Sequence, residues 1–170
     1  MRCLTDSECI DWIKAQSMVV SPYDDWEDHP VMKAGHYHQF GILNSAFLAE
    51  RLVASASPFK EALLWIIDDG WDITPIDALI NALRRSHGEN RPLGLVTGYL
   101  YDAAEGDEMA GLFFLTIEHG MSAYLYISGP NATFFNWEGT LIDAWTNSPD
   151  QTQEVQMIAD RWLQHGLDKV

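Results

Sequence analysis

The hydrophobic positions of the chain fall into blocks separated by Gly, Pro, Asp and Asn, and the densest block runs from Leu112 to Trp137. Within it, apolar, aromatic and β-branched runs are separated by breaks that contain Gly, a pattern typical of a β-meander. His119-Gly120 fits a two-residue hairpin turn, because Gly readily adopts the positive φ that such a turn requires. This register pairs Thr116 with Ala123. It predicts one buried face made of Leu112, Phe114, Met121, Ala123, Leu125 and Ile127.

Four other segments carry the spacing and end signals of amphipathic helices. Thr5 and Glu8 form a capping box before the first helix, and Thr74-Pro75 is a strong start for the third. In the third helix the apolar residues recur at the spacing of one helix face, and Gly88 ends the run. The helices are expected to begin near Asp6, Asn44, Pro75 and Asp150.

The remaining segments suggest further strands and loops. Residues 59–69 are ambiguous between helix and strand, but the apolar run Leu63–Ile67 favours a buried strand. Strands are also predicted at 18–20 and 93–101. Residues 35–43 are expected to form a strand or a loop and 102–108 a hairpin loop, and the segment 137–145 is expected to contain a short turn or helix. The prediction is therefore one α+β domain over residues 1–170, with a mostly antiparallel sheet of about five strands and helices packed on it.

Composition narrows the class of protein. Hydrophobic residues make up 47% of the 170 residues and aromatic residues 12%, which excludes general disorder. No apolar run approaches the roughly 20 residues of a transmembrane helix. Acidic residues interrupt the N-terminal region where a signal peptide would need a basic and then an apolar stretch, so we expect a cytoplasmic protein. Cys3 and Cys9 are expected to be reduced thiols.

The charge is strongly acidic. The formal net charge is −15, and no Lys or Arg occurs between positions 92 and 160. Such a surface repels nucleic acid and anionic lipid and attracts cationic partners, so we expect a basic protein partner, with no nucleic acid and no membrane. The alternative is that the charge serves only solubility. The oligomeric state stays open, a dimer included.

Acidic residues flank two of the tryptophans. Trp and Tyr are enriched at binding hot spots, and a neighbouring carboxylate can pair with a partner's Lys or Arg. The predicted partner-binding residues are Asp24, Asp25, Trp26, Glu27, Asp28, Trp71 and Asp72. The alternative is that both tryptophans are core residues beside turns.

One histidine cluster offers the only candidate for metal chemistry. His29, His36 and His38 could act with a neighbouring carboxylate as ligands, but their spacing matches no established metal motif. The prediction is no metal and no cofactor. No nucleophile elbow or phosphate-binding loop occurs, and no catalytic residue is assigned. A small hydrolase-like enzyme built on these histidines remains the first alternative function.

A resemblance points in the same direction as the charge. The segment from Trp71 to Tyr126 resembles small uncharacterised bacterial proteins, and the chain is similar in character to the immunity proteins of bacterial toxin systems. The residues that carry the resemblance are Trp71, Thr74, Pro75, Leu83, Arg84, Gly88, Arg91, Pro92, Leu93, Gly98 and Glu105. It implies no particular functional residue.

The expected function is thus a non-catalytic acidic binding protein, in the form of an immunity-type inhibitor of a basic toxin or nuclease. A second alternative is an oligomeric structural protein joined through the aromatic face of the sheet. The sequence also leads us to expect that Arg84 or Arg91 pairs with a carboxylate such as Glu105.

Overall fold

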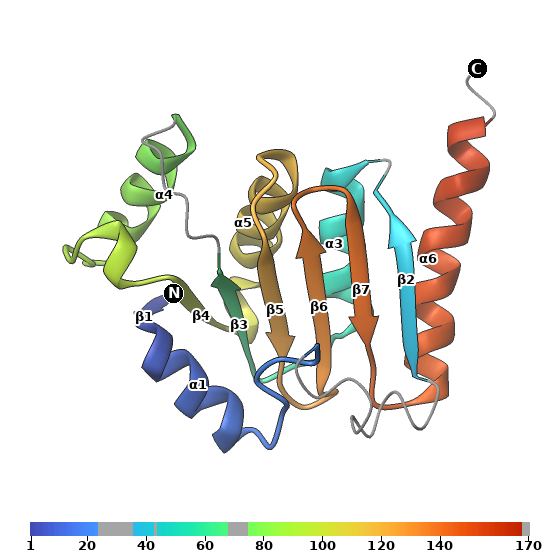
Figure 1. The fold of residues 1–170 in the computed structure, drawn as a ribbon, viewed down its shortest axis with the longest axis horizontal. Coiled ribbons are helices and arrows are strands. Elements are labelled where there is room, and N and C mark those ends of the chain that lie inside the picture. The colour runs from blue at the N-terminus through green and yellow to red at the C-terminus, as the bar shows by residue number, and fades with distance from the viewer. Residues whose placement is uncertain (24–35, 43, 68–74, 168–170) are drawn as a thin grey trace.

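The computed structural model describes residues 1–23, 36–42, 44–67 and 75–167, with side chains described as far as residue 160. It is an α+β structure in which one antiparallel sheet is flanked by helices (Figure 1). The predicted fold class is confirmed. The described residues form seven strands, two more than the expected number.

The strands come from the whole length of the chain. In spatial order the sheet reads β1-β4-β3-β5-β6-β7-β2, and each neighbouring pair is antiparallel. Their bounds are β1 Arg2–Leu4, β2 Tyr37–Gly41, β3 Glu61–Ile66, β4 Gly98–Asp102, β5 Ala123–Ile127, β6 Ala132–Trp137 and β7 Leu141–Trp145. The order places β2 at the edge beside β7, although about a hundred residues separate them in sequence.

The predicted helix starts are confirmed, and a fifth helix is present among the described residues. The helices are α1 Asp6–Ala15, α3 Ser45–Ser55, α4 Pro75–Ser86, α5 Gly106–Glu118 and α6 Pro149–Leu167. The capping box forms as expected, because the Glu8 N–H donates to Thr5 Oγ1 and the Thr5 N–H donates to Glu8 Oε2. The Asn44 side chain caps α3 by accepting from the Phe47 N–H at 3.2 Å.

The predicted meander is wrong in its first strand, because residues 106–118 form α5. An apolar run in which nearly every position is hydrophobic fits a fully covered helix as well as a strand. Here α5 packs on the sheet beside α3 (Figure 1), and it buries Met109, Leu112, Phe113, Thr116 and Ile117 at helical spacing. No hairpin therefore forms at His119-Gly120, and Thr116 does not pair with Ala123.

Part of the predicted buried face survives this correction. Ala123, Leu125 and Ile127 are fully buried on β5, and Leu112 is buried from α5, while Phe114 and Met121 are only half-buried. The strand interpretation of residues 63–67 is confirmed by β3.

Two local predictions are wrong, and two hold only in part. Residues 18–20 form no strand, and 102–108 hold a 3₁₀ turn (Ala103–Glu105) and the start of α5 instead of a hairpin loop. Of the segment 93–101, the first part is a 3₁₀ turn (Leu93–Leu95) and only the part from Gly98 onward is strand. The segment 137–145 contains the expected turn at 138–140, but residues 141–145 are strand β7.

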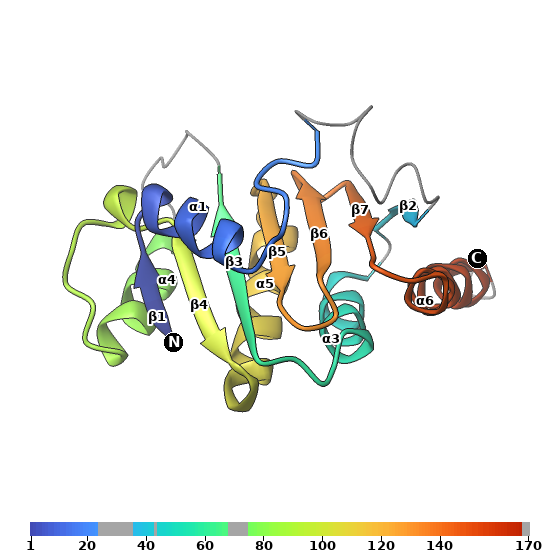
Figure 2. The same cartoon turned by 90° about the horizontal axis from the view of Figure 1, so that it is seen from below.

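The two faces of the sheet are covered differently. Figure 2 shows α1 on one side and α3 and α5 on the other, while α6 runs beside the β2 edge. The side chains of α3, α4, α5 and α6 pack with a largely aliphatic cluster of the sheet, which we call the helix-covered face. The opposite, α1-covered face is aromatic. Its buried strand residues are Leu63, Leu100, Tyr124, Tyr126, Phe135 and Trp145.

A glycine lets α1 lie directly on the sheet. A Cβ atom at Gly98 would lie 2.1 Å from the Cys9 Sγ, so no other residue fits at this point of β4 without displacing the helix. Cys9 is fully buried and free, and burial raises the pKa of its thiol to about 12. α1 thus covers only the β1-β4-β3 end of its face (Figure 2).

Candidate functional site

The most unusual side chain of the described structure is Asp143, a carboxylate with no solvent exposure at the centre of β7. Residues alternate across a strand, so Asp143 and Trp145 point to the α1-covered face while Ile142 and Ala144 point to the helix-covered face. Asp143 lies between Phe135 on β6 and Gln39 on β2. It therefore lies on the part of the aromatic face that α1 does not reach.

Four neutral groups donate hydrogen bonds to this carboxylate. The Tyr37 hydroxyl (2.5 Å) and the Gln39 Nε2 (2.9 Å) donate to Oδ1. The Trp137 Nε1 (2.5 Å) and the Tyr23 hydroxyl donate to Oδ2. We call these five residues the Asp143 cluster. Every oxygen of the carboxylate is partnered, which is the condition for burying such a group at tolerable cost.

The cluster contains no positive charge. Within the described part of the chain, Asp143 forms no ion pair with any Lys, Arg or His. Burial penalises the charged form and raises the pKa of the Asp143 carboxyl from 3.8 to about 6. The protein therefore holds an anion close to its surface that no cation of its own, within the described residues, compensates.

Aromatic rings enclose the cluster. The Tyr23 ring meets Phe135, Trp137 and Trp145 edge-on, with centroids 5.1 to 5.4 Å apart. Tyr37 lies 5.6 Å from Trp145. Tyr23 belongs to no strand, and these ring contacts hold it against the face of β6 and β7.

One side of the cluster is open to solvent. Trp137 is 39% exposed, and its partner across the β6–β7 ladder, Leu141, is 36% exposed. The next residue across, on β2, is Gly41, where an added Cβ atom would meet no atom within 4 Å. Trp137 and Leu141 therefore form an apolar ledge that no side chain of β2 covers.

The structure tests the predicted site residues only in part. Asp24, Asp25, Trp26, Glu27, Asp28, His29, Trp71 and Asp72 lie outside the described residues. The described residues on either side of 24–35 are Tyr23 and His36. Tyr23, which directly precedes the acidic segment, belongs to the Asp143 cluster. The carbonyl of His36 accepts from the Thr146 N–H at 3.0 Å, next to the end of β7.

The described histidines do not join Asp143. His38 pairs with Ala144 and stacks on Phe40 at 5.7 Å, so it faces away from the carboxylate. Among the described residues, no group of three His, Cys, Asp or Glu side chains could hold a metal ion. The predicted cluster of His29, His36 and His38 is therefore not assembled by the part that the structure describes.

The sequence analysis missed Asp143. The signal was a lone acid inside the apolar run Leu-Ile-Asp-Ala-Trp at 141–145. Read as a turn or short helix, this segment leaves the aspartate on the surface. Read as a strand, its alternation places Asp143 on the same face as Trp145, which makes it a buried-carboxylate candidate.

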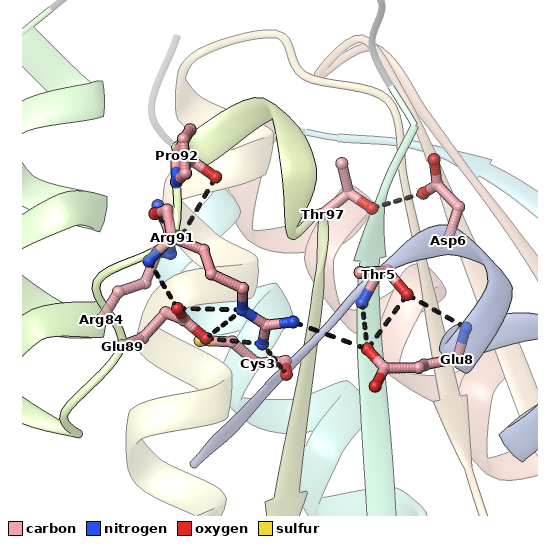
Figure 3. Close-up of polar contacts among 9 residues, drawn as sticks. All are labelled: Cys3, Thr5, Asp6, Glu8, Arg84, Glu89, Arg91, Pro92 and Thr97. Atoms are coloured by element: carbon pink, nitrogen blue, oxygen red, sulfur yellow. Dashed lines mark hydrogen bonds and ion pairs between the residues drawn. The ribbon is translucent and has the colours of Figure 1, made fainter.

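A second polar cluster, shown in Figure 3, braces the other end of the molecule. Arg91 pairs with Glu89 at 2.6 Å and donates to the Cys3 carbonyl at 2.9 Å. The buried Arg84 donates to the carbonyls of Arg91 and Pro92. The expected carboxylate partner of an arginine is thus present, but it is Glu89.

Glu105, the carboxylate proposed for that role, instead pairs with the N-terminal ammonium group of Met1. Arg91 connects β1 to the segment after α4, and Arg84 connects α4 to the same segment. We therefore assign this cluster to stability.

No family model, no curated protein and no solved structure matches the chain. Among the helices that the structure describes, none combines the length and the apolar character needed to cross a membrane.

Proposed function

We propose that this protein is an acidic, non-catalytic binding protein that engages a basic protein, in the form of an immunity-type inhibitor of a bacterial toxin or nuclease. The observation that carries the proposal is the attachment of Tyr23 to Asp143 and Trp137, immediately before the acidic segment 24–28. A rigid scaffold that fixes the base of a charged loop is a common design for recognition. The net charge of −15 supplies long-range attraction to a basic partner.

The alternatives have less support in the described residues. Asp143 has a raised pKa, as a general acid would, but it has no solvent exposure and both oxygens are occupied. The aromatic residues that an oligomer would use, Tyr124 and Tyr126, are 5% and 0% exposed within one chain. The histidines of the hydrolase alternative are described only in part, because His29 lies outside the described residues.

The test begins with capture of partners by the immobilised protein from a lysate of its source organism. The captured protein should be basic, and its association rate should fall as salt rises, because screening weakens electrostatic steering. Trp26→Ala should raise the dissociation rate by at least about tenfold, which corresponds to about 1.4 kcal/mol. Co-production with the protein should suppress the partner's toxicity.

A matched pair of variants distinguishes the contribution of the acidic segment 24–28 to binding from the contribution of net charge. One variant carries Asp24→Asn, Asp25→Asn, Glu27→Gln and Asp28→Asn. The control removes the same charge from exposed positions of four helices, through Asp11→Asn, Glu50→Gln, Asp107→Asn and Asp160→Asn. We expect only the first to lose the partner. Equal affinity in both variants and the native protein would refute the proposed role of the loop.

A further inference from the structure

The ledge of Trp137 and Leu141 is exposed, and the indole N–H of Trp137 is also hydrogen-bonded to a carboxylate. The indole N–H of Trp137 donates to Asp143 at 2.5 Å and also contacts the Tyr23 hydroxyl at 2.8 Å. Donation to an anion polarises the indole and adds electron density to its ring. The π face of a tryptophan already attracts cations through its quadrupole, and a carboxylate that accepts from the indole N–H at the ring edge strengthens that attraction.

The strands that form the ledge carry no cation of their own. No Lys or Arg occurs between positions 92 and 160, a range that includes β6, β7 and the turn between them. Asp143 also forms no ion pair among the described residues. Within the described part of the chain, the negative charge behind this surface is therefore left for a cation that a partner supplies.

We propose that the exposed face of Trp137, backed by Asp143 and flanked by Leu141, is the docking point for an arginine side chain of a protein partner. A planar, weakly hydrated guanidinium stacks on an aromatic ring, while its aliphatic stem covers a neighbouring apolar residue such as Leu141. This inference rests on the proposed function for the basic character of the partner. It uses only described residues, however, and does not depend on the acidic segment.

The test uses a small probe in place of the partner. N-acetylarginine amide carries the guanidinium, and N-acetylcitrulline amide is its neutral near-isostere. The seven tryptophans give separate indole N–H signals in NMR spectra, and Trp137→Phe identifies the signal of Trp137. At about pH 7.5, above the Asp143 pKa of about 6, we expect the arginine probe to shift that signal saturably and the citrulline probe to leave it unchanged.

Two sets of variants test the parts of the docking point. Asp143→Asn keeps the shape of the side chain but removes the charge, and it should weaken binding of the arginine probe by at least about threefold. Leu141→Lys places a cation across the ladder from Trp137 and should abolish the shift, whereas Leu141→Gln should retain it. If Asp143→Asn does not fold, the Leu141 pair decides the question.

The proposal is overturned if the two probes shift the Trp137 signal equally or if neither shifts it. It is also overturned if Leu141→Lys binds the arginine probe as the native protein does. None of these results bears on the acidic segment. Loss of the partner in the loop-neutralised variant, without any arginine effect at Trp137, would leave the proposed function standing and reject this docking point.

Discussion

The two faces of the sheet differ in chemistry and in how they are covered. On the helix-covered face, β3 and β5 contribute only aliphatic side chains, which belong to one buried cluster with side chains of four helices. On the α1-covered face, the same strands contribute Trp65, Tyr124 and Tyr126, and α1 reaches only one end. Because side chains alternate along a strand, the same strands build a stable core on one side of the sheet and an aromatic, polar surface on the other.

On the α1-covered face, hydrogen bonds from tyrosine hydroxyls attach residues 20–23 to the part of the sheet that α1 does not cover. Tyr126 donates to the Val20 carbonyl, and Tyr23 donates to Asp143, so a segment with no regular structure is held on the sheet. Stability thus resides mainly on the helix-covered face, and the candidate site lies on the other. Each prediction below tests this division, from the largest expected effect to the smallest.

The largest effect is expected from Leu125→Ala on the helix-covered face. Leu125 has no solvent exposure, so the truncation leaves a cavity and should cost about 2–5 kcal/mol in the free energy of unfolding. Leu141→Ala, at the exposed ledge, is the matched control and should cost less than about 1 kcal/mol. Denaturant unfolding measures both. Equal losses would contradict the division.

The Asp143 pKa predicts a specific dependence of stability on pH. Because burial raises this pKa from 3.8 to about 6, the native state holds the proton more tightly than the unfolded state. The resulting stability is fully present below about pH 3.8 and is lost as pH rises through about 6. The loss should be about 2–3 kcal/mol.

Comparison with a variant isolates this effect from the other acids. The free energy of unfolding of the native protein minus that of Asp143→Asn should fall between about pH 4 and about pH 7. A difference that stays constant or rises would mean that the four hydrogen bonds outweigh burial.

Two tyrosines on opposite faces, the half-buried Tyr37 and the buried Tyr99, sharpen the comparison further. Tyr37→Phe removes a donor from Asp143 and should cost about 0.5–1.5 kcal/mol. Tyr99→Phe should cost nothing or stabilise the protein, because the Tyr99 hydroxyl is buried without a hydrogen-bond partner in the described structure. Thermal unfolding of the two variants gives the ranking, and a larger loss at Tyr99 would reverse the expected roles.

The smallest effect is expected at the β1 edge of the sheet, where Arg91 connects β1 to the segment after α4. Arg91→Lys loses the forked contact with Glu89 and should cost less than about 1 kcal/mol, because the pair is partly exposed. Arg91 lowers the Glu89 pKa to about 2, so the contribution is present above about pH 4.5 and is lost as pH falls through about 2. Denaturant unfolding at both ends of that range tests it.

Local signals predicted four helix starts well but missed α5. Capping residues such as Thr5 and Asn44 act on the backbone next to them, so their effect can be read from sequence. The run Leu112–Ile117 gives no such signal, since a helix that packs on the sheet beside α3 and a covered strand are both rich in apolar residues. Only the tertiary packing of this segment decides between them.

The candidate site was less predictable than the fold. Tyr23 and Tyr37 are 120 and 106 residues from Asp143 in sequence, and no local pattern connects them. The pairing of β2 with β7 brings Tyr37 and Gln39 to the carboxylate, and that pairing follows from the closure of the whole sheet. The acid beside Trp26, by contrast, is visible in sequence alone.

The sequence by itself determined the α+β class, the helix starts and the strong negative charge, because each depends on composition or on residues a few positions apart. The tertiary structure decided that Leu112–Ile117 is helical, that β7 is a strand, and that Asp143 is buried among neutral donors. These outcomes depend on which distant segments exclude water from a residue. A carboxylate has its ordinary pKa in water, and only its enclosure by Tyr23, Tyr37, Gln39 and Trp137 makes Asp143 distinctive.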